Sequence, residues 1–191
     1  MELISVRELF KNTAAYAGKE VTIGGWVRNR RPSKQFGFIM LNDGTYFTPV
    51  QVVYNDTIEN FQEISKINIG AALIIKGIVE LTPGSKQPFE IQALSLAVEG
   101  PSTGDYPLQP KRHSMEFLRT ITHLRPRTNT FQAVFRVRSL AAMAIHQFFQ
   151  DRDFEYVHTP LITGSDCEGA GEMFQVHPGP EQSAHDRGRQ D

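Results

Sequence analysis

The sequence predicts a mainly β N-terminal domain, followed by a helical stretch that opens a second domain. Three observations lead to this prediction. From Glu20 to Val98 apolar residues alternate with polar or small ones, which is the period of half-buried strands. Turn-forming residues at 42–44 (NDG) and 82–85 (TPGS) separate these runs. Beyond residue 128 the apolar spacing changes to three and four residues, as in an amphipathic helix.

Composition and charge are typical of a globular protein of the cytoplasm. The 191 residues are 40% hydrophobic and 21% charged, and the net charge is -1. Any nucleic-acid-binding surface must therefore be local. The apolar runs are shorter than the roughly 20 residues of a membrane helix, and the N-terminus lacks the layout of a secretory signal. A single cysteine, Cys167, excludes an internal disulfide, and the six histidines lack the spacing of a zinc site.

The first element is a short helix that begins after Ser5. The segment Ser5–Glu8 has the pattern of a capping box. In that motif the serine oxygen accepts from a free backbone N–H, and the glutamate reaches back to the serine N–H.

Five alternating runs follow, and a helix is predicted over Thr57–Ile67 between the third and the fourth. Five strands with a helix after the third are the layout of an OB-fold barrel, which commonly binds single-stranded nucleic acid. We assign this domain to residues 1–100. The alternating residues are Val21, Ile23, Gly25 and Val27; Phe36, Phe38 and Met40; Val50, Val52 and Tyr54; Leu73, Ile75, Gly77 and Val79; and Phe89, Ile91, Ala93 and Ser95.

Residues 101–128 read as a linker or hinge, because 100–110 is rich in glycine and proline. Between Lys111 and Arg138 the chain carries seven lysines and arginines against one acid, Glu116. Two interpretations stay open. The run is a solvated basic face, or it neutralises phosphates of a bound RNA.

The next helix is predicted to begin at Asn129, with Gln132 three residues later as its capping partner. Its apolar stripe is wide and aromatic and requires a partner surface. The stripe consists of Phe131, Val134, Phe135, Leu140, Ala141, Ala144, Ile145, Phe148 and Phe149. We assign residues 129–176 to the start of a second domain. Residues 177–191 contain no large apolar side chain, so we expect a disordered tail.

The segment 153–176 carries the most specific pattern of the chain. Its extended stretch VHTPLI and its acidic, glycine-rich run SDCEGAGEMF resemble the first signature motif of class II aminoacyl-tRNA synthetases, and the second run resembles the bacterial asparaginyl enzymes. The resemblance implies a dimer-interface role for Pro160 and implies that Glu168 holds the α-ammonium group of the amino acid. Asp153 stands where the family often has glycine. Cys167 is expected to pack rather than to act as a nucleophile.

The predicted barrel resembles the anticodon-binding domain of asparaginyl, aspartyl and lysyl synthetases. The similar stretches are GGWVRNRR, FGFIMLNDG and VQVVYND. The resemblance implies that Phe38 stacks on the central anticodon base, a uridine, and that Gln51 reads it. It also implies that Arg31 contacts the backbone and bases of the RNA, and that Glu90 lies near the first anticodon position. A competing interpretation remains for Phe38, since a strand in which Phe36, Phe38 and Met40 alternate can turn that face to the core. The wider candidate surface adds Trp26, Arg28 and Arg30, and for Trp26 packing is favoured over base reading.

The resemblance implies an asparagine–tRNA ligase, a homodimer that uses ATP and Mg²⁺ to attach asparagine to its tRNA. The second and third motifs of this class, whose arginines hold the ATP phosphates, do not occur among the 191 residues. We therefore expect an incomplete chain that does not bind ATP or form the adenylate by itself. The alternatives are a fragment of an aspartyl-type synthetase and a non-catalytic module that binds tRNA or single-stranded nucleic acid.

Overall fold

The computed structural model describes residues 2–162, 164, 174 and 176. Glu168, Cys167 and the tail 177–191 lie outside the described residues. The chain divides into two compact units, Met1–Met143 and Ala144–Asp191, and each is described by itself. The division of the domains at residues 100, 128 and 176 stays a prediction.

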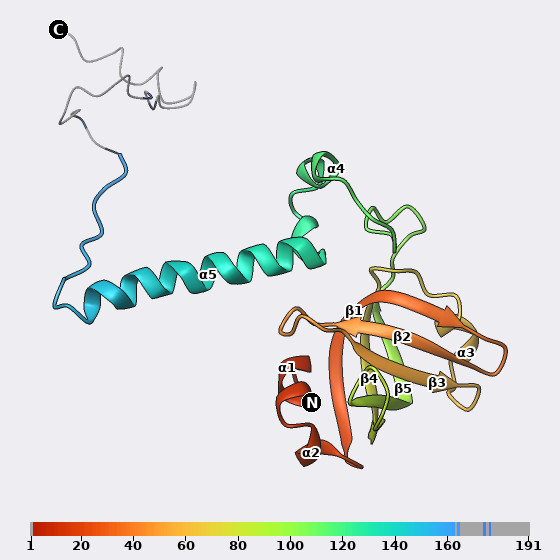
Figure 1. The fold of residues 1–191 in the computed structure, drawn as a ribbon. Coiled ribbons are helices and arrows are strands. Elements are labelled where there is room, and N and C mark those ends of the chain that lie inside the picture. Colours follow the sequence, from red (N-terminus) through yellow and green to blue (C-terminus); the bar gives the residue numbers. More distant parts are fainter. Residues whose placement is uncertain (1, 163, 165–173, 175, 177–191) are drawn as a thin grey trace, which may run out of the picture. The chain divides into compact units, whose positions relative to one another are not determined.

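The first unit contains a closed barrel, which confirms the five-stranded OB-fold (Figure 1). Its strands follow one another around the barrel in the order β1-β2-β3-β5-β4. The β3–β5 pair is parallel and the other four pairs are antiparallel. The strands are β1 (Glu20–Pro32), β2 (Phe36–Asn42), β3 (Val50–Asn55), β4 (Ala72–Leu81) and β5 (Phe89–Gly100).

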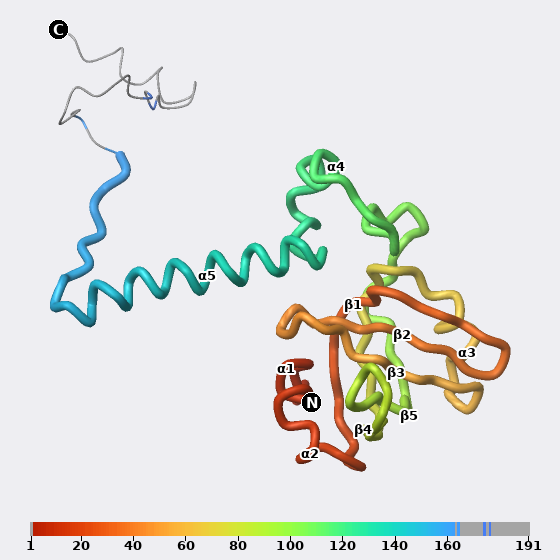
Figure 2. The backbone as a smooth tube through the Cα atoms, in the orientation of Figure 1, coloured from red at the N-terminus to blue at the C-terminus, as the bar shows by residue number. Residues whose placement is uncertain are grey.

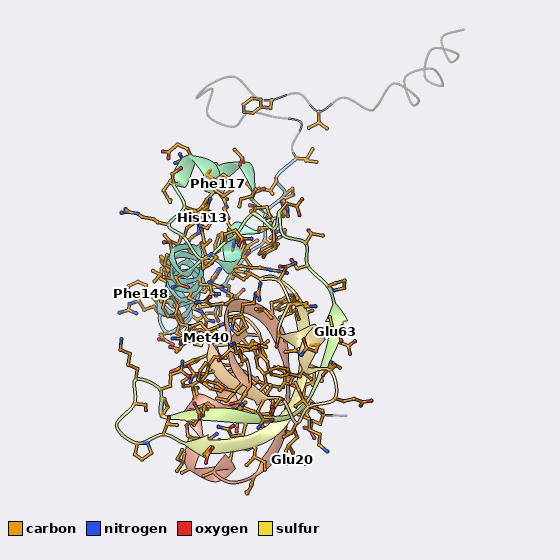
Figure 3. All side chains as sticks on the ribbon, turned by 90° about the vertical axis from the view of Figure 1, so that its right-hand side faces the viewer. Glu20, Met40, Glu63, His113, Phe117 and Phe148 are labelled. Carbon is orange, nitrogen blue, oxygen red and sulfur yellow. The ribbon has the colours of Figure 1, made fainter. Side chains whose placement is uncertain are left out.

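Aliphatic side chains from every strand fill the barrel, and the space inside it is crowded with side chains (Figure 3). The alternation predicted for β1, β3 and β4 is confirmed. In β2 the sequence left two interpretations open, because both faces of this strand are apolar. Ile39 and Leu41 are the fully buried residues. Phe36, Phe38 and Met40 lie on the outer face, so the competing interpretation of Phe38 as a core residue is wrong.

Two irregularities shape the barrel. β1 is long and bends to pair with both β2 and β4, and its register with β2 shifts between Val27 and Asn29 (Figure 2). Arg28 occupies this bulge. The β4–β5 register shifts next to Gly77, where an added Cβ would overlap the Gln92 carbonyl oxygen and lie 2.7 Å from Ile91 Cγ2. The shift moves the buried position to Leu96, so the prediction of Ser95 on the core face is wrong.

The N-terminal helices are α1 (Val6–Lys11) and α2 (Thr13–Tyr16). Half of the predicted capping box is confirmed, since Glu8 N donates to Ser5 Oγ at 3.1 Å. The other half is wrong, because Glu8 Oε1 accepts from Asn12 Nδ2 at 2.8 Å instead of reaching back to Ser5. The turn that precedes β3 supplies a further cap, as Val6 N donates to Asp43 Oδ2 at 2.8 Å.

The helix predicted over Thr57–Ile67 is present only as α3 (Phe61–Ile64). Hydrogen bonds of two asparagine side chains limit the length of this helix. Asn55 Oδ1 accepts from Thr57 N at 3.2 Å and forms a turn, which competes with a helix start there. Asn60 Nδ2 donates to the Leu96 carbonyl at 2.9 Å and ties the segment to β5.

Three helical elements follow the barrel: α4 (Met115–Thr120), the 3₁₀ turn η1 (Arg125–Arg127) and α5 (Asn129–Gln150). Ser114 caps α4 by accepting from Phe117 N at 3.2 Å. The predicted cap of α5 is wrong by one residue. Thr128 Oγ1 accepts from Phe131 N at 3.4 Å, whereas the Asn129 side chain is occupied by Arg28.

The second unit begins inside α5. Past the helix end, Asp153 takes a positive φ of 60°, and Phe154 N donates to the Phe149 carbonyl at 3.1 Å. Phe149 contacts both Phe148 and Phe154 edge-on. No helix in the described ranges has the length and apolar character needed to cross a membrane.

Gly37 is required where the Tyr54 ring crosses beneath β2. A Cβ at residue 37 would lie 2.7 Å from Tyr54 Cε1 and closer still to the hydroxyl oxygen, and the ring is only 2% exposed. Gly37→Ala should lower the free energy of unfolding by about 1–3 kcal/mol through this overlap. Urea unfolding followed by circular dichroism measures the loss.

Gly100→Ala is the matched control, because it also adds a methyl group to a strand. The added Cβ would lie 3.6 Å from Ala72 Cβ, an ordinary contact. Equal unfolding midpoints for the two variants would contradict the packing argument.

Candidate nucleic-acid interface

The outer face of the barrel brings together side chains from four strands. Because successive residues of a strand point to opposite faces, the residues between the buried ones face outward. One cross-strand row follows the register Arg31–Phe38–Val53–Gln92 over β1, β2, β3 and β5, and the adjacent row is Asn29–Met40–Gln51.

Phe38 lies on this surface and not in the core. Its ring is half-exposed, Phe36 contacts it edge-on at 5.6 Å between centroids, and Arg31 Cζ lies 5.6 Å from its centroid. Phe36 itself is 45% exposed. A half-exposed ring with a guanidinium beside it offers a flat apolar surface and a cation, the combination on which nucleobases stack.

A hydrogen-bonded chain of polar side chains lies beside the ring. Gln51 Nε2 donates to Glu90 Oε2 at 3.0 Å, and Gln92 Nε2 donates to Glu90 Oε1 at 2.9 Å. The backbone N–H of Gln51 donates to Gln87 Oε1 at 3.2 Å. Gln87 and Gln92 were not among the site residues predicted from the sequence. Period two would have placed Gln92 on the face of Glu90, but no local signal indicates Gln87.

Arg31, Gln51 and Glu90 line a single cavity of about 350 Å³ between the outer face and the 82–88 hairpin. Phe38 does not line this cavity, but it pairs with Arg31 in register. The cavity therefore offers a cation, an amide and a carboxylate near the half-buried Phe38 ring. Such a set can stack on one base and form hydrogen bonds to its edge.

The other three residues of the wider candidate surface form contacts within the chain, away from the Phe38 ring. Arg30 Nη1 donates to the Ser65 carbonyl at 3.0 Å. Arg28 donates to the Arg127 carbonyl through Nη1 and to Asn129 Oδ1 at 3.2 Å through Nη2. Burial lowers the pKa of the Arg28 guanidinium, and the nearby Arg127 acts in the same direction. Trp26 packs under Arg127, whose Cζ lies 4.7 Å from the indole ring.

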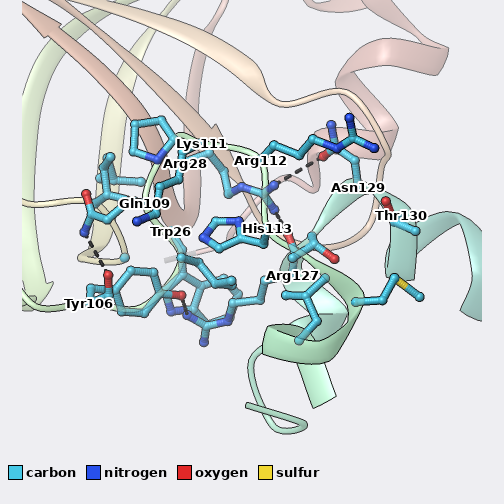
Figure 4. Close-up of a pocket in the computed structure, with 18 residues that line it drawn as sticks. Trp26, Arg28, Tyr106, Gln109, Lys111, Arg112, His113, Arg127, Asn129 and Thr130 are labelled. Atoms are coloured by element: carbon cyan, nitrogen blue, oxygen red, sulfur yellow. Dashed lines mark hydrogen bonds between the residues drawn. The ribbon is translucent and has the colours of Figure 1, made fainter. Parts of the chain in front are cut away.

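A second cavity of about 620 Å³ lies where residues 106–130 pack on the barrel (Figure 4). No acid is among its lining residues. Its cationic side chains are Arg28, Lys111, Arg112 and Arg127, with His113 beside them. Arg127 is engaged by Trp26 and by the Tyr106 hydroxyl at 3.2 Å, whereas Lys111 and Arg112 are exposed. The basic run thus serves the packing of this region as well as its surface.

Comparison with known proteins relates the chain to tRNA synthetases. Residues 21–99 match an OB-fold nucleic acid binding domain, and residues 114–184 match the tRNA synthetases class II (D, K and N). The chain is 62% identical over 176 residues to an asparagine–tRNA ligase of Alkaliphilus oremlandii and 60% identical to one of Desulfitobacterium hafniense. The chain corresponds to part of the asparagine–tRNA ligases. Each match covers 92% of this chain and 38% of the relative, so the chain spans well under half of these ligases.

Solved structures of two synthetases show the same fold. Asparaginyl-tRNA synthetase from Pyrococcus horikoshii, complexed with asparaginyl-adenylate, matches 93% of this chain and 41% of that chain with a TM-score of 0.80 and 23% identity. Aspartyl tRNA synthetase from Entamoeba histolytica matches 84% of this chain and 39% of that chain with a TM-score of 0.68. The two family models confirm the OB-fold followed by the start of a class II synthetase domain.

The two residues expected from the signature motif belong to the second unit. Pro160 lies in an exposed stretch that belongs to no helix or strand. Glu168 lies outside the described residues, so both roles stay predictions.

Phe38→Ala should lower the free energy of unfolding by only about 1 kcal/mol, because the ring is half-buried on the outer face. The control is Phe89→Ala, which removes a ring that is 0% exposed. That variant should lose about 3–5 kcal/mol. Equal losses, measured by urea unfolding, would place Phe38 in the core.

Proposed function

We propose that this chain binds the anticodon loop of an asparagine tRNA on the outer face of its barrel. One observation carries the proposal. The half-buried Phe38 ring has Arg31 beside it. Near it on the same face, the Gln51 amide donates a hydrogen bond to the Glu90 carboxylate. The match to an OB-fold nucleic acid binding domain supports the choice of a nucleic acid as ligand.

Each residue has a distinct role in this proposal. Phe38 stacks on the central base, a uridine, and Gln51 reads its edge, since an amide both donates and accepts. Arg31 contacts the RNA backbone and the bases, and Glu90 lies near the first anticodon position. The net charge of -1 favours this local, stacked mode over attraction by a general field.

The activity proposed for the whole protein is the attachment of asparagine to its tRNA. The identity of 60–62% to asparagine–tRNA ligases supports it. ATP and Mg²⁺ would supply the activation of the amino acid, Glu168 holds its α-ammonium group, and Pro160 contributes to a homodimer interface. A cytoplasmic location fits this role. An aspartyl-type activity is disfavoured, because the two relatives at 60–62% identity are asparagine–tRNA ligases.

The experiment is fluorescence anisotropy of the full chain with a labelled anticodon stem-loop of an asparagine tRNA. We expect micromolar or weaker affinity, which falls with added salt as counterion release weakens. Phe38→Ala should lose about 1–3 kcal/mol of binding free energy, because it removes the stacking surface.

Phe47→Ala is the control, since it also removes a phenylalanine ring from the surface, but Phe47 lies in the turn before β3 and is 45% exposed. It should leave the affinity unchanged. Equal binding by the wild type, the Phe38→Ala variant and the control would refute the proposed surface.

A further inference from the structure

Three polar side chains form a continuous chain across β5 and β3. Glu90 accepts one amide hydrogen bond at each carboxylate oxygen, from Gln51 Nε2 at 3.0 Å and from Gln92 Nε2 at 2.9 Å. An ionised carboxylate has no hydrogen to donate. Both glutamines must therefore turn their NH₂ groups toward Glu90, and neither can present its carbonyl oxygen there.

This restraint matters for Gln51, because an amide is nearly symmetrical in shape. A freely rotating amide exchanges its oxygen and its nitrogen by a half-turn. Uracil presents an N3–H donor and an O4 acceptor, whereas cytosine presents an N3 acceptor and an N4 amino donor. An unrestrained glutamine can match either base by turning over, whereas a glutamine of fixed orientation matches only one.

The backbone of Gln51 is fixed as well. Its N–H donates to Gln87 Oε1 at 3.2 Å, which ties β3 to the 82–88 hairpin. Directly beneath the polar chain, Val52 and Ile91 pair in register and are both 0% exposed. Hydrogen bonds thus hold Gln51 at its backbone N–H and at its side-chain amide. The buried Val52–Ile91 pair beneath it is close-packed and resists rearrangement.

We propose that Glu90, positioned by Gln92, fixes the orientation of the Gln51 amide and thereby sets the preference for uridine over cytidine at the central anticodon base. The inference rests on the proposed function of this surface and assigns Glu90 and Gln92 as positioning residues. A half-turn of Gln51 would bring its oxygen against the Glu90 carboxylate. Two acceptors would then face each other without a hydrogen, so the orientation that suits cytidine is disfavoured.

The test replaces the carboxylate by an amide of the same shape. In Glu90→Gln, residue 90 can donate or accept, so Gln51 is free to turn over. We expect the ratio of the Kd for a cytidine-substituted stem-loop to the Kd for the uridine stem-loop to fall by about tenfold. Most of the change should be a gain in affinity for cytidine. The two stem-loops differ only at the central base, so any direct contact of Glu90 with the first base cancels in the ratio.

Glu80→Gln is the matched control, because Glu80 pairs with Glu90 in register on β4 and the exchange removes the same charge. It should leave the ratio unchanged. Gln92→Met is the second variant, since it frees one oxygen of Glu90 without touching Gln51, and it should lower the ratio by a smaller factor. If the Glu90→Gln variant fails to fold, the Gln92→Met variant provides the test.

The outcomes separate the two proposals. A wild-type chain that does not distinguish uridine from cytidine overturns both. A wild-type preference for uridine that persists unchanged in both Glu90→Gln and Gln92→Met supports the proposed function and overturns the role of Glu90. A fall in the ratio for Glu80→Gln as large as that for Glu90→Gln also overturns it, because the effect would then follow from charge alone.

Discussion

The parallel contact between β3 and β5 is the constraint on which the rest of the barrel depends. It joins segments about 40 residues apart through the register pairs Val52↔Ile91 and Val53↔Gln92. The first pair is buried, so the neighbouring positions must face outward. Gln51 and Glu90 therefore meet on the surface because Val52 and Ile91 meet in the core. Burial of aliphatic side chains both closes the barrel and assembles the polar chain of the candidate site.

Alternation in the sequence predicted the five strands, because most strands have one apolar face, and together with the family resemblance it predicted the fold. It could not decide the face of β2, whose sequence FGFIMLN is apolar on both sides. The structure resolves the ambiguity through tertiary packing. Ile39 and Leu41 fill the interior, and Gly37 leaves room for the Tyr54 ring. The outer residues of β2 are then apolar without being core, which is the expected character of a stacking surface.

Residues close in sequence predicted one helix cap correctly. The prediction of another cap failed because a side chain from a distant part of the sequence bonds to the capping residue. Ser5 caps α1 as expected, but Asn129 does not cap α5, because Arg28 from the β1 bulge takes its side-chain oxygen. The same limit applies to the site. Resemblance to a family indicated Gln51 and Glu90 separately, whereas their hydrogen bond depends on the β3–β5 contact. Gln87 reaches Gln51 from a hairpin, so no pattern near either residue indicates it.

The cations after the barrel show why a count of charges overstates the surface available to RNA. Arg127 packs on Trp26 and donates to Tyr106, and Arg125 lies over the Phe131 ring with its Cζ 4.7 Å from the centroid. These two arginines stabilise the region that follows the barrel, so less of the basic run is free to neutralise phosphates. Lys111, Arg112, Arg119 and Arg138 remain exposed. Because the net charge is -1, no general field draws RNA to the chain, and we expect stacking and base reading on the outer face of the barrel to add to the phosphate contacts that these four cations can make.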